Sequence, residues 1–534
     1  MSEQIHKRPN AIGSLIIVGA MLALTRTVHV WQEGSILAWA LLGLAAGCTA
    51  ALLLGWTRLV KGSLRKNRVR IALLALVGAG ALTLNGCEST WKVLAVPPHF
   101  VSHQLCSAVF VAGLEPVGYY REAIQPKFGA ASNFIRYELD RQRREVRVSF
   151  MGVVKSRSIY EGPLGCRVTH AAEPVPERTA MVPSSVPATP VETIAPQSAA
   201  LADALQHAFA DPQTAPHRYT KAVVVVHRGR IIGERYASGV TSATPLQGWS
   251  MTKSVTNALL GILVRKGKLD MNAPAPIAEW SSLGDSRHRI TSDQLLRMVS
   301  GIGCGDSLHT AGWHTLFDPD TQMEYDIPDQ ASFAAKAGLR AKPGDQWQYT
   351  NCNYVLLSRI IRDAIGGDPV RVRTFFENEI FKPLGIETAT FEFDSAGTPL
   401  GTAQLWASAR DWARFGLLYL RDGVTSSGQR LLPEGWVDYS AQLTAQSSDL
   451  GYGAGFWTQR GNSSGGRARI AAGMPADSFM AVGSQGQYTI VIPSEDLVIV
   501  RLGWSYTPDD DIIATERLTR EVIAAVHTSK ELQN

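Results

Sequence analysis

The sequence predicts an α+β fold: an antiparallel sheet flanked by helices, with a mostly helical subdomain beside it and transmembrane helices before it. The pattern over residues 222–237 predicts a strand, a tight turn and a second strand, and residues 478–503 again have the pattern of strands. Helical periodicity recurs between them, over 251–267, 292–300, 353–365, 408–421 and 433–441. These observations predict a sheet assembled from both ends of the domain, closed by an amphipathic helix over 511–528.

Three apolar stretches open the chain, at about 11–31, 35–56 and 71–96. The second runs for about 22 residues without a charge, which is long enough to cross a hydrocarbon core of ~30 Å. The third contains Glu88 and Lys92, so its apolar part is short. The pattern predicts a membrane anchor of about three transmembrane helices over residues 1–96.

A basic loop separates the second apolar stretch from the third. Because positive loops stay in the cytoplasm, we expect the N-terminus inside and everything after residue 96 outside, which for a bacterial inner membrane is the periplasm. An alternative is a lipoprotein signal in which Leu84-Asn85-Gly86 precedes a lipidated Cys87. Both interpretations put the globular part on the same side. The basic residues are Arg58, Lys61, Arg65, Lys66, Arg68 and Arg70.

Composition narrows the function. A hydrophobic share of 45% with 19% charged residues is typical of a chain that buries a large core. The net charge of +5 comes from the N-terminus: residues 1–70 hold nine Lys/Arg and two Asp/Glu, and the remaining residues hold 43 and 45. We therefore expect no nucleic-acid partner for the globular part.

Six cysteines are present, but none forms a CxxC pair and no histidines have HExxH spacing, so we expect no metal site. An oxidising compartment would permit a Cys106–Cys166 disulfide, and the alternative is two buried free thiols. Cys304 and Cys352 can likewise be bridged or free. A bridge there would brace Asn351, which directly precedes Cys352.

Residues 97–170 are expected to form a small α+β module. The segments 135–139 and 146–150 alternate with period two around a charged turn, which predicts a β-hairpin. Residues 171–200 carry six prolines and read as a semi-extended linker. The domain with the strands and helices described first then occupies residues 201–534.

The segment Gly248-Trp249-Ser250-Met251-Thr252-Lys253-Ser254 opens a very apolar helix. Lys253, three residues after Ser250, lies on the same helix face, with Cβ atoms roughly 5–6 Å apart. A free lysine has a pKa near 10.4, so it would act as a base only if burial lowered that pKa, and a shift of about 3 units corresponds to roughly 4 kcal/mol. The alternative is an N-cap serine followed by an exposed lysine.

Two further segments carry candidate chemistry. Tyr349 can share a proton with Lys253, and Asn351 can hold Lys253 or a substrate carbonyl; alternatively the segment is a strand-to-helix turn with an N-cap asparagine. Gly483 and Ser484 stand where backbone N–H groups could complete an oxyanion hole with Ser250. Taken alone, that stretch reads as a glycine-rich bend.

These three pieces, in this order, resemble the serine β-lactamase and penicillin-binding-protein superfamily. The chain is most similar to class C β-lactamase-related hydrolases of the 6-aminohexanoate-dimer hydrolase and esterase type. The likeness covers about 201–530 and includes Ala409-Arg410-Asp411-Trp412-Ala413-Arg414-Phe415-Gly416 and Leu432-Pro433-Glu434-Gly435-Trp436. It implies a β-lactamase/transpeptidase-like fold and an acyl-enzyme on Ser250, with Lys253 and Tyr349 moving the proton and no cofactor.

One departure and two alternatives qualify that resemblance. The third motif of β-lactamases carries Lys-Thr-Gly, whereas the matching stretch here is Gly483-Ser484-Gln485-Gly486, so the cation for a β-lactam carboxylate is missing. This favours an esterase, amidase or peptidase over an efficient β-lactamase, and a penicillin-binding-type D,D-peptidase or a β-lactamase is the first alternative. An acylated membrane sensor without turnover is the alternative from another class, but it would need a cytoplasmic output domain. Asp411 could be catalytic, but such a residue more often caps or pairs at a helix start.

Overall fold

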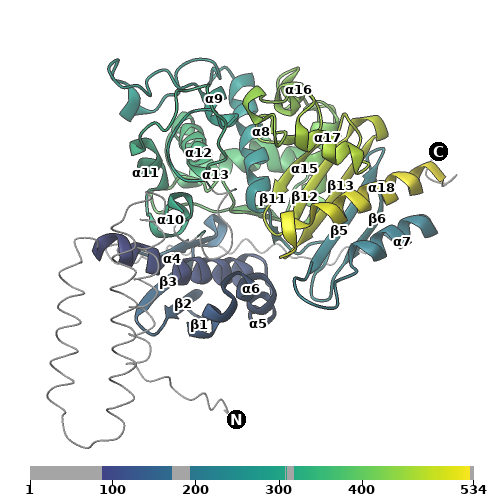
Figure 1. The fold of residues 1–534 in the computed structure, drawn as a ribbon, viewed down its shortest axis with the longest axis horizontal. Helices are drawn as coiled ribbons and strands as arrows, with labels where there is room; N and C mark the ends of the chain where they lie inside the picture. Colours follow the sequence, from purple (N-terminus) through teal and green to yellow (C-terminus); the bar gives the residue numbers. More distant parts are fainter. Residues whose placement is uncertain (1–86, 171–192, 307, 309–314, 316–317, 529–534) are drawn as a thin grey trace, which may run out of the picture. The chain divides into compact units, whose positions relative to one another are not determined.

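The structure, a computed structural model, describes residues 87–170, 193–306, 308, 315 and 318–528 (Figure 1). The first two expected transmembrane stretches, the basic loop, residues 84–86 of the alternative lipoprotein signal and most of the linker lie outside the described residues. The end of the third stretch, from Cys87, begins helix α4. In the described part of the chain, every helix is too short or not apolar enough to cross a bilayer. One compact unit runs onward from Ala95.

The central sheet has six antiparallel strands in the order β10-β11-β12-β13-β5-β6. As predicted, both ends of the domain build it. β13 pairs with β5 and joins the two halves, with Val498 opposite Val226. The strands are β5 (Thr220–His227), β6 (Arg230–Tyr236), β10 (Trp457–Thr458), β11 (Phe479–Gly483), β12 (Gln487–Ile492) and β13 (Leu497–Gly503).

Helices cover both faces of this sheet (Figure 1). On one face, α7 (Ala199–Ala208) and α18 (Ile512–Thr528) pack together over a buried cluster that includes Val225 and Ile490. On the other face lies α15 (Ala409–Leu420). A Cβ added to Gly416 of α15 would meet the Val498 side chain at 2.6 Å, so only glycine allows this approach.

A helical subdomain stands between the strands of the two ends. α8, which follows Ser250, buries twelve of its fourteen residues. The helix expected over 292–300 ends at Leu296 instead, because Met298 adopts a left-handed φ of 61° and turns the chain. The helices are α8 (Thr252–Arg265), α9 (Ser292–Leu296), α10 (Pro319–Asp326), α11 (Gln330–Lys336), α12 (Asn351–Ile365), α13 (Pro369–Phe376), α14 (Lys382–Leu384), α16 (Trp436–Ala441) and α17 (Ser464–Ala471). A small sheet, β7 (Leu246–Gln247), β9 (Leu405–Ala407) and β8 (Thr390–Phe391), accompanies them.

Residues 95–170, called the module from here on, combine helices with a four-stranded antiparallel sheet of order β1-β2-β3-β4. The predicted hairpin is confirmed, with Leu139 opposite Val146. A disulfide joins Cys106, at the end of α4, to Cys166 on β4. The elements are α4 (Cys87–Cys106), α5 (Pro116–Tyr119), α6 (Gln125–Phe128), β1 (Ile135–Asp140), β2 (Glu145–Phe150), β3 (Val154–Tyr160) and β4 (Cys166–Val168).

Candidate active site

Ser250 lies in a single 3₁₀ turn, Trp249–Met251, that leads directly into α8. Lys253 follows in the first turn of α8, and its Nζ donates to Ser250 Oγ at 2.9 Å. A second bond runs from the same Nζ to the Thr402 main-chain carbonyl, also at 2.9 Å. Lys253 is 1% exposed, so the alternative of a solvent-exposed lysine does not hold.

Burial gives this amine an unusual acidity. Removal from water disfavours the ammonium form and lowers the pKa of Lys253 to about 8. The carboxylates of Glu324 and Asp320 act in the opposite direction and raise it. A general base works best when its pKa is close to the operating pH, and this value meets that condition.

Tyr349 lies beside the amine. Lys253 Nζ is 5.0 Å from the centroid of the Tyr349 ring and 5.7 Å from that of Tyr354. Tyr349 is buried and stacks on Trp457, with centroids 5.9 Å apart and planes 26° apart. Tyr354 instead donates its hydroxyl to a main-chain carbonyl in the core. The structure therefore brings Tyr349 to the amine and uses Tyr354 for packing.

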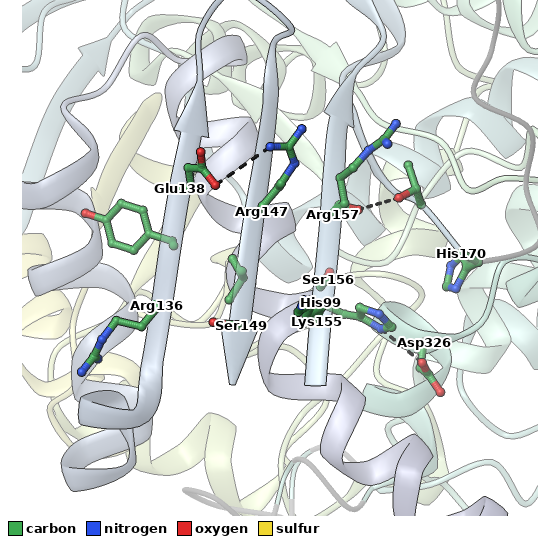
Figure 2. A pocket seen from close by; sticks show the side chains of 13 residues that line it. His99, Arg136, Glu138, Arg147, Ser149, Lys155, Ser156, Arg157, His170 and Asp326 are labelled. Carbon is green, nitrogen blue, oxygen red and sulfur yellow. Dashed lines mark hydrogen bonds and ion pairs between the residues drawn. The ribbon is translucent and has the colours of Figure 1, made fainter. Parts of the chain in front are cut away.

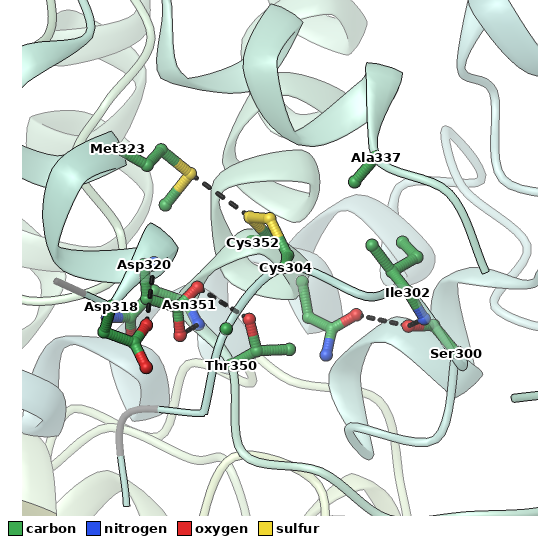
Figure 3. The surroundings of a disulfide bond; sticks show 12 residues. Ser300, Ile302, Cys304, Asp318, Asp320, Met323, Ala337, Thr350, Asn351 and Cys352 are labelled. Carbon is green, nitrogen blue, oxygen red and sulfur yellow. Dashed lines mark hydrogen bonds between the residues drawn. A yellow bond between two sulfur atoms is a disulfide. The ribbon is translucent and has the colours of Figure 1, made fainter. Parts of the chain in front are cut away.

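Asp320 holds the segment that carries Tyr349. Its Oδ1 accepts the Thr350 hydroxyl at 2.7 Å, and its Oδ2 accepts the Asn351 N–H at 2.9 Å (Figure 3). Burial raises the pKa of Asp320 to about 7, although both hydrogen bonds act to lower it. The sequence analysis missed Asp320; the one signal it offered was a Pro-Asp pair at the start of a helix, which is too common to single out a site.

A disulfide between Cys304 and Cys352 lies next to this segment (Figure 3). It joins the first turn of α12 to the loop after α9, as a brace behind Asn351. Asp320 approaches both sulfur atoms, but the bridge leaves no thiolate for a metal ion. Lys253 makes no hydrogen bond to Asn351, and the buried Asn351 Oδ1 has no partner among the described residues.

The end of β11 lies directly against Ser250. A Cβ added to Gly483 would come within 2.1 Å of the Gly248 carbonyl oxygen and 3.1 Å of the Ser250 nitrogen. Only a residue without a side chain permits this approach, which explains the glycine at position 483. Ser484, the next residue, is exposed at the turn into β12.

Gln485 turns inward from the same stretch. Its Oε1 accepts the Trp249 indole N–H at 3.2 Å, and its Nε2 donates to the Ala123 carbonyl of the module at 3.0 Å. Trp249 adopts a left-handed φ of 48°, a conformation that costs an L-residue about 1–3 kcal/mol unless its surroundings hold it. Gln485 is one of the groups that hold it.

Glu324, on α10, is a second residue that the sequence analysis missed. Its Oε1 is buried and has no hydrogen-bond partner among the described residues. Burial raises the pKa of this carboxyl, and the Lys253 ammonium partly offsets the rise. A buried carboxyl and a buried amine that shift each other's pKa are typical of a functional site.

Asp411 has the structural role that the sequence suggested. Its Oδ2 accepts both the main-chain N–H and the hydroxyl of Thr388, at 2.9 and 2.6 Å. Its Oδ1 pairs with Arg414 at 2.6 Å. Asp411 thus fixes the start of α15 to the loop that precedes β8.

Comparison with known proteins identifies the family. The protein-family model described as Beta-lactamase matches residues 205–522, more than half of the chain. The chain belongs to the beta-lactamase family. It is a serine hydrolase of this family, which confirms the resemblance inferred from the motifs.

Individual relatives of this family member are distant. The 6-aminohexanoate-dimer hydrolase of Paenarthrobacter ureafaciens is 25% identical over 347 residues, which cover 62% of this chain and 83% of that protein. Among solved structures, a penicillin-binding protein homolog from Caulobacter crescentus is 16% identical, covering 63% of this chain and 99% of that one with a TM-score of 0.47. A beta-lactamase from Sulfitobacter sp. EE-36 is 18% identical, covering 61% and 98%, with a TM-score of 0.46.

Proposed function

We propose that this serine hydrolase cleaves an amide or ester bond through an acyl-enzyme on Ser250. One observation carries the proposal: the 2.9 Å contact between Lys253 Nζ and Ser250 Oγ in a buried site. Neutral Lys253 takes the hydroxyl proton as Ser250 Oγ attacks the substrate carbonyl. Tyr349 helps return that proton to the leaving group. Water then hydrolyses the acyl ester, and Ser250 regains its proton.

The negative charge that develops on the attacked carbonyl oxygen must be stabilised by hydrogen-bond donors. The close packing of Gly483 on Ser250 supports an oxyanion hole made by the main-chain N–H groups of Ser250 and Ser484. One such donor contributes about 2.7–4 kcal/mol to the transition state. The unpartnered Asn351 amide oxygen is a candidate acceptor for a substrate N–H.

The substrate class follows from what the third motif holds. Gln485 stands where a β-lactamase has its Lys-Thr-Gly motif, and its side chain is engaged with Trp249 and the module. This favours linear amides or esters over β-lactams. The name of the Paenarthrobacter relative, a 6-aminohexanoate-dimer hydrolase, points to the same class.

We also propose that the protein is anchored in a bacterial inner membrane with its catalytic domain in the periplasm. The apolar N-terminal stretches and the basic loop support this. The Cys106–Cys166 disulfide is typical of an oxidising compartment. Protease added to spheroplasts should degrade the domain after residue 96, and full protection in intact spheroplasts would contradict the topology.

A substrate panel tests the activity. The full-length protein in detergent is assayed with chromogenic esters, a linear amide, a D-alanyl peptide and a β-lactam, alongside Ser250→Ala and the matched control Ser426→Ala, an exposed loop serine. We expect steady turnover of an ester or linear amide that only Ser250→Ala abolishes. Preference for the D-alanyl peptide or the β-lactam would mark a D,D-peptidase or a β-lactamase. A single burst without turnover would mark an acylated sensor.

A further inference from the structure

The module packs directly on the residues that flank the nucleophile. Phe100, from α4, stacks on Trp249, with ring centroids 6.3 Å apart and planes 17° apart. The same ring makes an edge contact with Tyr325, 5.0 Å away, which follows Glu324. Phe100 is 2% exposed, so this contact excludes water. One phenyl ring of the module therefore touches the neighbours of both Ser250 and Glu324.

A second set of contacts fixes the module beside the third motif. The Ala123 carbonyl accepts from both Gln485 Nε2, at 3.0 Å, and the Tyr506 hydroxyl, at 2.6 Å. Nearby, Lys221 Nζ donates to Glu122 at 2.6 Å. The partners on the hydrolase domain lie in the turn between β11 and β12, at the start of β5 and just after β13. The module therefore packs against the end of the central sheet where β5 begins and β13 ends.

Lys127 stands at this junction. It lies on α6, half-buried, and its Nζ is 5.5 Å from the Phe100 ring centroid. Its charge lowers the pKa of Glu324, and so does the charge of Lys253. The two amines therefore act on one buried carboxyl, Lys253 from the hydrolase domain and Lys127 from the module.

We propose that the module forms one wall of the catalytic cleft and that Lys127 gives this wall an anion subsite, so that the preferred substrate carries a carboxylate near its scissile amide or ester. The proposal rests on the proposed function and deepens it. In the β-lactamase motif the cation stands on the strand next to the nucleophile, where this chain has Gly483-Ser484-Gln485-Gly486. Here Gln485 binds the module instead, and the module brings the cation from its own helix α6.

Two matched esters test the subsite: the mono-p-nitrophenyl ester of adipic acid, which has a free carboxylate, and the neutral p-nitrophenyl hexanoate. The variants are Lys127→Met, which keeps the aliphatic stem, Lys127→Arg, which keeps the charge, and the control Lys155→Met. Lys155 is an exposed cation of the same module and lines a cavity of about 870 Å³ on its sheet (Figure 2). All variants are measured in the full-length protein.

Lys127→Met is expected to lower kcat/KM for the carboxylated ester about 10- to 100-fold, mainly through KM, and to change the neutral ester less than twofold. Lys127→Arg should restore most of the loss, and Lys155→Met should change neither ester. Equal losses on both esters, or no loss on the carboxylated one, would overturn the subsite.

A binding measurement separates this proposal from the proposed function. Adipate is titrated into Ser250→Ala, where turnover plays no part, and Lys127→Met in that background should weaken its affinity at least tenfold. Unchanged affinity overturns the subsite even if Ser250 is the nucleophile. Conversely, wild-type ester rates in Ser250→Ala would sink the proposed function while the titration still decides on Lys127.

Discussion

Two regions of this molecule place basic side chains in opposite surroundings, one buried and one in contact with solvent. In the hydrolase domain, Lys253 is enclosed by protein, and its pKa is lowered to about 8. On the open face of the module sheet, Arg147 of β2 keeps contact with solvent. It pairs with Glu145 on its own strand and with Glu138 on the neighbouring strand β1 (Figure 2). The difference teaches that a lysine amine becomes a base where burial removes it from water, whereas basic side chains that keep contact with solvent form ion pairs.

The largest expected effect separates these two regions by activity. Lys253→Met should lower kcat/KM for the best ester at least 10³-fold, because Lys253 Nζ is hydrogen-bonded to Ser250 Oγ and is placed to take its proton. Stopped-flow release of p-nitrophenol measures the acylation step. Arg147→Met, on the module face, is the control and should stay within a fewfold of wild type. Wild-type acylation in Lys253→Met would show that the base lies elsewhere.

The second effect is on stability and has the opposite sign. The folded pKa of Lys253, about 8, lies below the ordinary value of 10.5, so the unfolded chain binds more protons between these two pH values and wild-type stability rises with pH across them. At pH 7 the buried amine therefore costs free energy, and Lys253→Met should raise the free energy of unfolding by about 1–3 kcal/mol.

Denaturant titrations of the purified protein measure this gain. The advantage of Lys253→Met should shrink as the pH rises from 8 towards 10.5. A variant that is destabilised equally at pH 7 and pH 10 would show that the two hydrogen bonds of Lys253 outweigh its desolvation.

A third test uses the pH profile of the wild-type protein. Because the base form of Lys253 is required, kcat/KM should rise about tenfold per pH unit below an apparent pKa of about 8 and level off above it. The measurement is initial rates at low substrate from pH 5.5 to 9.5. A flat profile through pH 6–9 is incompatible with Lys253 as the base.

The smallest effect concerns the support behind the site. Asp320→Asn replaces one acceptor oxygen by a donor and so removes one of the two hydrogen bonds to Thr350 and Asn351. We expect a loss of about 1–2 kcal/mol in stability and a several-fold drop in kcat with KM nearly unchanged. Asp363→Asn, at an exposed position of α12, is the control. A loss of stability with full kcat would leave Asp320 a purely structural cap.

The sheet and the pairing of Ser250 with Lys253 could be predicted from the sequence because both leave local signatures. Short runs of apolar residues mark β5, β6 and the strands after residue 478, and Ser250 with Lys253 opens an apolar helix. The confirmed hairpin of the module is equally local. A helix end set by one left-handed residue, Met298, leaves no such periodic signal, and there the expected helix was too long.

The remaining parts of the site depend on burial between distant segments. Glu324 and Asp320 lie on a short, polar helix, and nothing in its pattern shows that folding removes both carboxyls from water. Likewise, no local signal shows that Phe100 would reach Trp249 or that Gln485 would bind the module. Contacts across 150–360 residues follow from the assembled fold, not from spacing.

Mass spectrometry of the acyl-enzyme tests the central claim most directly. The full-length protein is mixed with a slow ester, quenched in acid within the turnover time and digested with trypsin. The account predicts the acyl mass on Ser250, in the peptide that ends at Lys253, with no adduct in Ser250→Ala and a greatly slowed one in Lys253→Met. An acyl group on any other residue, or turnover without a covalent intermediate, would contradict it.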